Sequence, residues 1–237
     1  VIRTAAIHDS NPEIAGAIAR GIPVYERAQA WGGIMRGYRN ALCISGTHGK
    51  TTTTSMATHI FMAAQKDPTV MIGGTLPLLG KGYRVGKGDT IILESCEYCN
   101  SFLNFFPTVA VILNVAADHL DFFKNLNDIE HSFRQFACLT PENGFIIANG
   151  DDPGAREALS GLDRKVYWFS VKDRKADVYA DNVAFFDGRK YVTPDTFLLN
   201  GTRRQYLLGT GVLTECRITP SDLGGFERVV LINAMLG

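Results

Sequence analysis

The sequence is poor in the features that mark nucleic-acid-binding, membrane-bound and secreted proteins. Its 24 basic and 24 acidic residues leave a formal net charge of zero, so no excess charge favours nucleic acid or an anionic membrane as a partner. No apolar run approaches the length of a membrane span, and the first residues, VIRTAAIHDS, do not resemble a signal peptide. The 46% hydrophobic and 20% charged fractions are those of a soluble globular protein, which is the class we expect.

The cysteines are too few and too scattered for a disulfide framework. The five are Cys43, Cys96, Cys99, Cys138 and Cys216. We therefore expect a reducing, cytoplasmic setting. Cys96 and Cys99 have the C-x-x-C spacing of half a zinc site or of a redox pair. Since no second pair of Cys or His residues accompanies them, we interpret them as ordinary cysteines beside a functional acid.

Strand-like and helix-like segments alternate between residues 41 and 150. Val109–Val115 is fully apolar, as in strands that are buried on both faces of a parallel sheet. The alternation predicts an α/β fold with a doubly wound, mostly parallel sheet and right-handed crossovers. From about residue 165, strand-like runs are separated by turn residues and predict a small antiparallel extension of the same domain. These runs are Lys165–Phe169, Val178–Phe186 and Thr196–Leu199.

Residues 1–38 have the pattern strand, loop, helix, short strand, helix. Asn11 is a good helix cap, and Pro12 suits the first turn of the helix that follows. The segment is too small to bury a core of its own. We interpret it as the last α/β part of a larger, Rossmann-like domain, with residues 39–237 forming a second domain.

The strongest motif is SGTHGKTT at residues 45–52, between a predicted strand and a predicted helix. Its glycines let backbone amides face a phosphate, and the helix dipole favours an anion there. Lys50 supplies a cation for the terminal phosphates, and the Thr51 hydroxyl is placed to bind Mg²⁺. Ile44 stands where the full Walker loop has its first glycine, so this is the shorter G-T-x-G-K-T variant. We predict ATP and Mg²⁺ as ligands, with the nucleotide bound by Gly46, Thr47, His48, Gly49, Lys50, Thr51 and Thr52.

Further ligands for Mg²⁺ are expected at the carboxyl ends of neighbouring strands, because this ion prefers oxygen donors. Glu94 ends one strand-like run, and Glu97 follows three residues later. Asn114 and the pair Asp118-His119 follow the buried run that starts at Val109. An acid or an imidazole at such a position can hold a metal or orient a phosphoryl group. We therefore take both segments as candidate parts of the site.

Three stretches, GTHGKTTTTSM, ESCEYCNSFL and NVAADHLDFF, resemble in order and spacing the central-domain signatures of the Mur ligases. The histidine in GTHGKT points to the branch that adds alanine to UDP-N-acetylmuramate or to the related branch that recycles murein peptides. The stretch ESCEYCNSFLNFFPTVAVILNVAADHLDFF is more similar to the alanine branch. AIHDSNPEIAGAIARGIPVYERAQ resembles the end of the UDP-sugar domain, and IIANGDDPGAREAL resembles a later central-domain stretch.

The resemblance implies an ATP-dependent ligase of peptidoglycan precursor synthesis. Such an enzyme joins L-alanine to the lactyl carboxylate of UDP-N-acetylmuramate through an acyl phosphate. It implies catalytic roles for Lys50, His48 and His119, a metal site of Thr51, Glu94 and His119, and adenine contact by Asn233. Only Asn233 and Ala234 remain of the motif H-N-x-x-N-A, since Val229 and Val230 replace its His and first Asn. Arg134 is the basic residue of the helix after His119, so we predict no modified lysine there.

Three other functions stay open at this stage. A P-loop NTPase or phosphotransferase would have an Asp at the end of the strand beside the loop strand, whereas Glu94 ends that run here. A non-catalytic nucleotide-binding fragment is compatible with the missing UDP-binding glycine turn and C-terminal domain of these ligases. The murein peptide recycling ligase shares the same loop motif. The sequence does not predict an oligomeric state.

Overall fold

The computed structural model describes residues 1–4, 7–170, 172–179, 191–194 and 208–217. Within these ranges, no helix is both long and apolar enough to cross a membrane.

One mixed sheet of eight strands organises the chain, in the order β10-β9-β8-β7-β3-β6-β4-β5. Every neighbouring pair is parallel except β4 and β5 at one edge. The strands are β3 (Asn40–Ser45), β4 (Thr69–Leu76), β5 (Lys81–Arg84), β6 (Thr90–Glu94), β7 (Val109–Ile112), β8 (Phe145–Asn149), β9 (Val166–Ser170) and β10 (Val178–Tyr179). This arrangement confirms the predicted α/β fold with a doubly wound, mostly parallel sheet.

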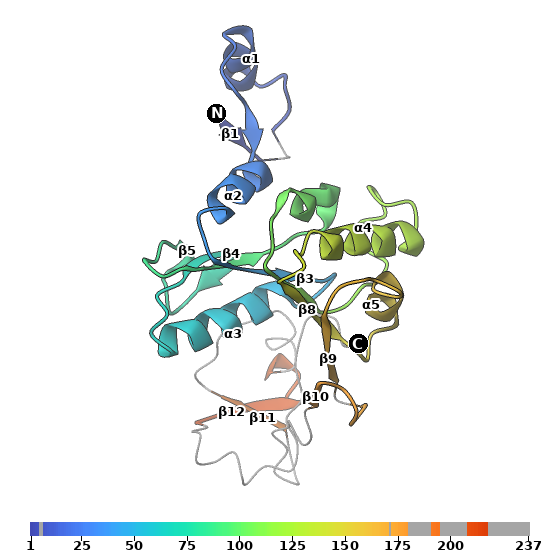
Figure 1. Ribbon diagram of the computed structural model, residues 1–237. Coiled ribbons are helices and arrows are strands. Elements are labelled where there is room, and N and C mark those ends of the chain that lie inside the picture. The colour runs from blue at the N-terminus through green and yellow to red at the C-terminus, as the bar shows by residue number, and fades with distance from the viewer. Residues whose placement is uncertain (5–6, 171, 180–190, 195–207, 218–237) are drawn as a thin grey trace.

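Helices cover both faces of the sheet, with α3 on one face and α4 on the other (Figure 1). Alternate residues of each strand point to opposite faces, so Cys43 packs in the α4-side core and Ile44 in the α3-side core. The α4-side core is the larger one and includes the buried aromatic side chains of Phe102, Phe133 and Phe136. The helices are α1 (Pro12–Ala19), α2 (Arg27–Met35), α3 (Lys50–Ala63), α4 (Leu126–Cys138), α5 (Pro153–Ala158) and the 3-10 helix η1 (Tyr98–Asn104).

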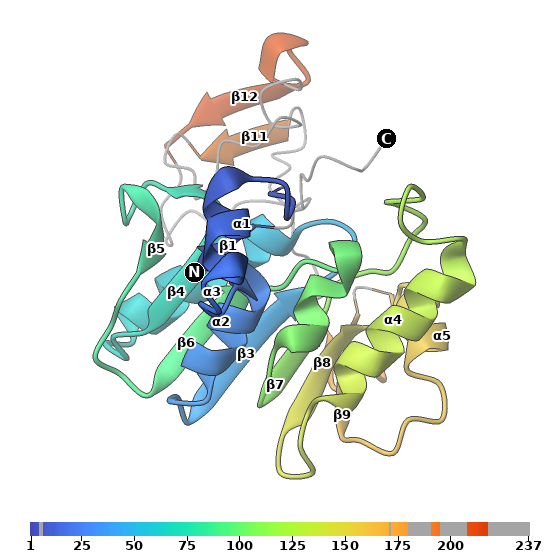
Figure 2. The same ribbon diagram turned by 90° about the horizontal axis from the view of Figure 1, so that it is seen from above.

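The first part of the chain projects from the sheet beyond α2 (Figure 1), and in the view from above α1, β1 and α2 overlie one another in front of the sheet (Figure 2). It holds a separate two-stranded parallel sheet of β1 (Ile2–Arg3) and β2 (Tyr25–Glu26). Asn11 caps α1 as predicted, because its side-chain oxygen accepts a hydrogen bond from the backbone N–H of Glu13 at 2.9 Å. Ile2 and Tyr25 are more than half exposed, which shows how little core this segment buries.

The predicted antiparallel extension is wrong where the structure describes it. β9 pairs in parallel with β8, and β10 pairs in parallel with β9, so Lys165–Phe169 continues the main sheet. The separate pair of β11 (Tyr191–Pro194) and β12 (Leu213–Cys216) is also parallel. Turn residues between strand-like runs do not set strand direction; helix α5 crosses over between β8 and β9 and returns the chain in the same direction. The predicted strand Thr196–Leu199 lies outside the described residues.

Candidate functional site

The site lies where the winding of the sheet reverses. β3 is flanked by β6 on one side and β7 on the other, and the chain continues outward from both. In open α/β sheets, ligands bind outside the carboxyl ends of the strands at such a switch point. The segments after β3, β6 and β7 all meet at this edge, and these segments carry the predicted site residues.

The loop after β3 depends on two glycines with positive φ. Gly46 has φ 146°, and a Cβ at this position would lie 2.9 Å from the Cβ of Leu113. Gly49 has φ 83° and forms the N-cap of α3 in the left-handed region. Among the residues that the structure describes, no side chain caps this helix. The first N–H groups of α3 therefore have no acceptor from a capping side chain, and they are available to an anion.

Asn114 fixes the middle of the loop. Its side chain accepts a hydrogen bond from the His48 N–H at 2.8 Å and donates one to the His48 carbonyl at 3.0 Å. Its own carbonyl accepts a hydrogen bond from the Thr47 N–H at 3.0 Å. The amides of Thr47 and His48 are thus already engaged, which leaves the first turn of α3 as the source of free amides. The Thr47 hydroxyl in turn contacts the backbone of Ala116.

The ammonium group of Lys50 lies at the base of the loop and makes three kinds of contact. It donates to the carbonyl of Gly46 at 2.6 Å and to that of Thr47 at 3.1 Å. It also forms an ion pair with Glu97, at 2.8 and 3.1 Å from the two carboxylate oxygens. The Glu97 side chain is 2% exposed. The sequence marked Glu97 only as a second acid near Glu94, so its pairing with Lys50 is a finding of the structure.

Thr51 and Glu94 meet at the amino end of α3. The Thr51 hydroxyl donates to one Glu94 carboxylate oxygen at 2.9 Å, and the other oxygen accepts from the Gly73 N–H at 2.6 Å. Two neighbouring ligands of an octahedral Mg²⁺ at its usual bond length lie about 2.9 Å apart. The spacing of the two oxygens therefore fits a magnesium ion. Within the described residues, no three His, Cys, Asp or Glu residues gather as a metal cluster.

His119 lies across the site from Lys50. Its backbone has φ 51°, and its ring packs against Tyr98 with 4.7 Å between ring centroids. Its Nε2 atom is 3.7 Å from a carboxylate oxygen of Glu97. The Tyr98 hydroxyl donates to Asp121 at 2.8 Å, and this bond raises the pKa of Tyr98 to about 12. The site thus joins Lys50, Glu97 and His119, while Thr51 of α3 and Glu94 of β6 form a second pair at the amino end of α3.

Cys96 and Cys99 are both free. Desolvation raises the pKa of the Cys96 thiol, and the neighbouring charge of Glu97 adds a smaller contribution. A thiol with a raised pKa is a weaker nucleophile and a weaker metal ligand at neutral pH. The interpretation of the C-x-x-C pair as ordinary cysteines beside a functional acid stays a prediction.

A cavity of about 310 Å³ adjoins the site between the first part of the chain and the end of β6. It is lined by Thr4, Glu26, Arg27, Ala28, Trp31, Met71, Glu94, Cys96, Tyr98, Ser101 and Phe105. Glu94, which bonds to Thr51, therefore also lines this cavity, as does Tyr98, which packs against His119. Arg27 brings a cation to its wall.

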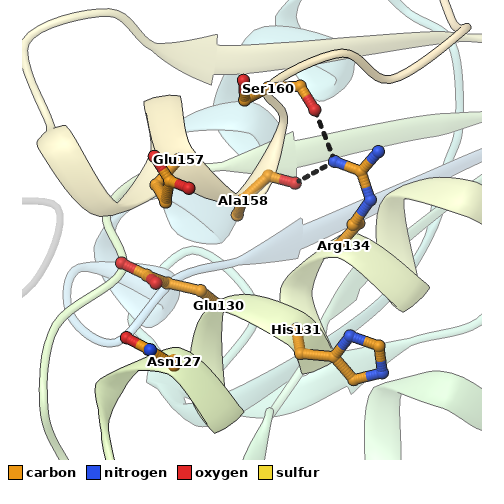
Figure 3. Close-up of a pocket in the computed structure, with 7 residues that line it drawn as sticks. All are labelled: Asn127, Glu130, His131, Arg134, Glu157, Ala158 and Ser160. Carbon is orange, nitrogen blue, oxygen red and sulfur yellow. Dashed lines mark hydrogen bonds between the residues drawn. The ribbon is translucent and has the colours of Figure 1, made fainter.

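A second hollow, of about 570 Å³, lies between α4 and α5 (Figure 3). Arg134 donates there to the carbonyls of Ala158 at 3.2 Å and Ser160 at 2.6 Å, and so caps the carboxyl end of α5. Burial raises the pKa of Glu130, and the nearby charge of Glu157 adds to the effect. This arginine acts on helix packing, away from the phosphate loop.

The structure gives no defined side-chain contact to the other residues that were predicted to bind the nucleotide, among those that it describes. His48 and Thr52 are half-buried in the loop and in the first turn of α3, and no side-chain contact defines a role for either. Asn233, predicted to approach adenine, lies outside the described residues. Asn114 was noted in the sequence only as a neighbour of the site. Its two contacts with His48 join residues 66 positions apart and leave no local signal in the sequence.

Solved structures share this fold. The crystal structure of UDP-N-acetylmuramate-alanine ligase from Thermotoga maritima matches with a TM-score of 0.62 and 28% identity, over 73% of this chain and 39% of that chain. The crystal structure of UDP-N-acetylmuramate:L-alanyl-gamma-D-glutamyl-meso-diaminopimelate ligase from Neisseria meningitides matches with a TM-score of 0.65. Its 24% identity, over 71% of this chain and 57% of that chain, supports the fold alone.

Curated relatives are more similar in sequence. The UDP-N-acetylmuramate–L-alanine ligase of Agathobacter rectalis is 49% identical over 79% of this chain, and that of Caldicellulosiruptor saccharolyticus is 47% identical over 79%. The chain spans 40% and 41% of the length of these two relatives. The family model described as the Mur ligase middle domain matches residues 44–204. The chain therefore belongs to the Mur ligase family and carries its middle domain.

Proposed function

We propose that the chain is the ATP-binding part of a UDP-N-acetylmuramate–L-alanine ligase of peptidoglycan precursor synthesis. The observation that carries the proposal is the meeting of Thr51 and Glu94, 2.9 Å apart, at the uncapped start of α3 beside Lys50. Such an arrangement suits a magnesium-bound triphosphate. Relatives up to 49% identical that bear this ligase name support the choice of reaction.

The proposed reaction activates a poor acylating agent. A lactyl carboxylate oxygen of UDP-N-acetylmuramate bonds to the γ-phosphorus of ATP as the bond to the β-phosphate oxygen breaks and ADP leaves, and the resulting acyl phosphate has a good leaving group. The amine of L-alanine then attacks the acyl carbon, phosphate leaves, and the nitrogen loses a proton as the amide forms. The protein's task is to position the reactants and neutralise charge, so it needs no serine or cysteine nucleophile.

Each residue has a defined part in this scheme. Lys50 and the first amides of α3 hold the transferred phosphoryl group. Thr51 and Glu94 would hold Mg²⁺, which neutralises phosphate charge when bound. His119 contacts Glu97, the partner of Lys50, and His48 lies in the loop that precedes Lys50. The cavity beside Glu94, with Arg27 on its wall, offers an approach for an acidic sugar substrate.

The domain boundaries belong to the same proposal. Residues 1–38 are proposed as the end of a UDP-sugar-binding domain, because they form a two-stranded sheet that leaves apolar side chains such as Ile2 exposed. Residues 39–237 are proposed as the ATP-binding domain. A cytoplasmic location suits the free cysteines and the need for ATP.

The first test is the Lys50→Ala variant. Removing the cation is expected to lower ATP-dependent turnover roughly a hundredfold or more, since Lys50 neutralises the transferred phosphoryl group. Calorimetry reports ATP affinity, and phosphate release is measured with UDP-N-acetylmuramate and L-alanine present. Lys66→Ala, an exposed lysine beyond the end of α3, is the matched control. Unchanged affinity and turnover in Lys50→Ala would contradict the proposal.

Substrate dependence separates the proposed ligase from its alternatives. Phosphate release that needs both UDP-N-acetylmuramate and L-alanine supports the alanine ligase. Release that needs a murein tripeptide in place of alanine identifies the recycling ligase. Release with neither substrate identifies an NTPase, and ATP binding without any release identifies a nucleotide-binding protein.

A further inference from the structure

One buried carboxylate connects two of the residues that the proposed reaction uses. Glu97 is 2% exposed and lies 2.8 Å from the ammonium group of Lys50 and 3.7 Å from Nε2 of His119. Both of its oxygens are within hydrogen-bond distance of Lys50, at 3.1 and 2.8 Å. A carboxylate so enclosed has no oxygen open to a substrate. Glu97 is thus suited to act on the reaction only through its two neighbours.

The pairing determines where the Lys50 ammonium group lies. A lysine ammonium has three N–H donors on a flexible stem, so its position follows from its acceptors. The acceptors here are the carbonyls of Gly46 and Thr47 and the carboxylate of Glu97. Among the described residues, Glu97 is the residue that forms an ion pair with Lys50. One Glu97 oxygen, Oε1, lies 3.1 Å from the Lys50 ammonium and 3.7 Å from Nε2 of His119, so the carboxylate holds the ammonium group close to the His119 ring.

The backbone around Glu97 is shaped to place it. Cys99 and Asn100, two and three residues later, have φ values of 53° and 54°, a region that side chains other than glycine rarely adopt. Such conformations persist where surrounding contacts fix them. Here Asn100 accepts a hydrogen bond from Ser132 of α4, and Phe102 stacks on Phe136 with 4.6 Å between ring centroids. The turn that carries Glu97 is therefore fixed to the main core.

The other neighbour of Glu97 is fixed in a similar way. His119 also has a positive φ, and its ring lies against Tyr98, whose hydroxyl is bonded to Asp121. Tyr98 follows Glu97 directly in the chain. Two consecutive residues thus contact His119: the Glu97 carboxylate lies 3.7 Å from Nε2, and the Tyr98 ring packs against the imidazole.

We propose that Glu97 is a positioning residue, which sets the separation between the Lys50 ammonium and the His119 imidazole for phosphoryl transfer. The inference rests on the proposed ligase function. It separates the two acids after β6 by role, with Glu94 beside Thr51 on the metal side and Glu97 behind Lys50 and His119. Because small displacements of catalytic groups can cost about a hundredfold in rate, the effect belongs to turnover more than to binding.

The test is Glu97→Gln, which keeps the size of the side chain and removes its charge. We expect kcat to fall at least about tenfold, while the Kd for ATP with Mg²⁺ does not weaken, because a buried negative charge near the phosphates is removed. A purely structural role would instead weaken ATP binding and thermal stability together. Glu142→Gln, at an exposed acid before β8, is the control.

Glu97→Asp keeps the charge but withdraws it by one methylene, and it also guards against a Gln variant that does not fold. We expect its kcat to lie at least threefold above that of Glu97→Gln and below that of the unchanged protein. A kcat unaffected by Glu97→Gln, an Asp variant no better than the Gln variant, or parallel losses of ATP affinity and stability would overturn the inference. Failure of the proposed function is distinguishable, since the unchanged protein itself would then show no substrate-dependent phosphate release.

Discussion

Helices α3 and α4 cover opposite faces of the same sheet, and they use their sequences differently. Helix α4 begins with a side-chain cap from Asn125 and buries Ile129, Phe133 and Phe136 in the larger core. Helix α3 begins at Gly49 with no side-chain cap. The stronger helix contributes to stability. The weaker start of α3 leaves N–H groups free at the edge of the sheet where the site lies.

The interior of α3 shows the same contrast. Its buried positions are Thr54, Ser55 and Thr58, and each hydroxyl donates to the carbonyl four residues earlier, at 2.7 to 2.8 Å. Threonine and serine are modest helix formers, and such bonds satisfy a buried hydroxyl without adding apolar burial. Helix α3 is therefore held in place mainly by the sheet and by the loop at its start.

The greatest loss of stability is expected from truncating a buried ring of α4. Phe133→Ala removes a fully buried ring and should lower the free energy of unfolding by about 3–5 kcal/mol. ATP affinity of the folded fraction should stay unchanged, because Phe133 lies away from the loop. Urea unfolding and calorimetry measure the two quantities. Ile60→Ala on α3, where the side chain is 65% exposed, is the control and should change stability by less than about 0.5 kcal/mol.

A smaller effect tests the function of α3. Thr51→Val keeps the shape of the side chain and removes the hydroxyl that meets Glu94. We expect ATP affinity in the presence of Mg²⁺ to fall roughly tenfold, equal to about 1.4 kcal/mol, with little change without Mg²⁺. Thr51→Ser, which keeps the hydroxyl, should behave like the unchanged protein. Equal loss with and without Mg²⁺ would show that Thr51 does not act through the metal.

The Asn125 cap of α4 gives a further test of the difference between the two helices. Asn125→Ala removes the acceptor for the Asp128 N–H and should cost about 1 kcal/mol of stability. ATP binding should not change, because Asn125 caps α4, on the face of the sheet opposite α3. Thermal unfolding checks the cost, with Asn127→Ala in the exposed first turn of α4 as the control. A loss of ATP affinity in Asn125→Ala would mean that α4 and the site are coupled.

The smallest effect concerns the platform under His119. The hydrogen bond to Asp121 raises the pKa of Tyr98 to about 12 from 10.0. It favours the neutral phenol, so its contribution to stability is complete below pH 10 and is lost as the pH rises through about 12. Asp121→Asn should lower this pKa and remove the small stabilisation that goes with it at neutral pH. Absorbance titration, taken as the difference from Tyr98→Phe, measures it; an unshifted titration would contradict the assignment.

The sequence was informative where chemistry and local structure coincide. The loop of residues 45–52 lies between β3 and α3 as predicted, and Glu94 ends β6 beside it. Both features follow from local patterns, because an apolar run that ends in a glycine loop or an acid marks the end of a buried strand. The meeting of Thr51 and Glu94 could be expected because parallel strands end at one edge.

Contacts between distant segments could not be predicted in the same way. Lys50 and Glu97 are 47 residues apart, and the burial that makes their pairing strong arises only when η1 packs against α4. The direction of β9 was predicted wrongly for a similar reason. Alternating residues show that a strand forms, but the crossover through α5 sets its direction relative to β8.

The double hydrogen bond of Asn114 with His48 has a consequence for the kinetics of ligand capture. A loop whose shape is already set by the neighbouring strand loses little conformational entropy when a nucleotide arrives. Association with ATP should then proceed in one rapid step at a rate set by diffusion and charge, without a slower rearrangement of the loop. The phosphate cradle is preorganised by an amide side chain whose hydrogen bonds, among the described residues, run to the backbone of His48.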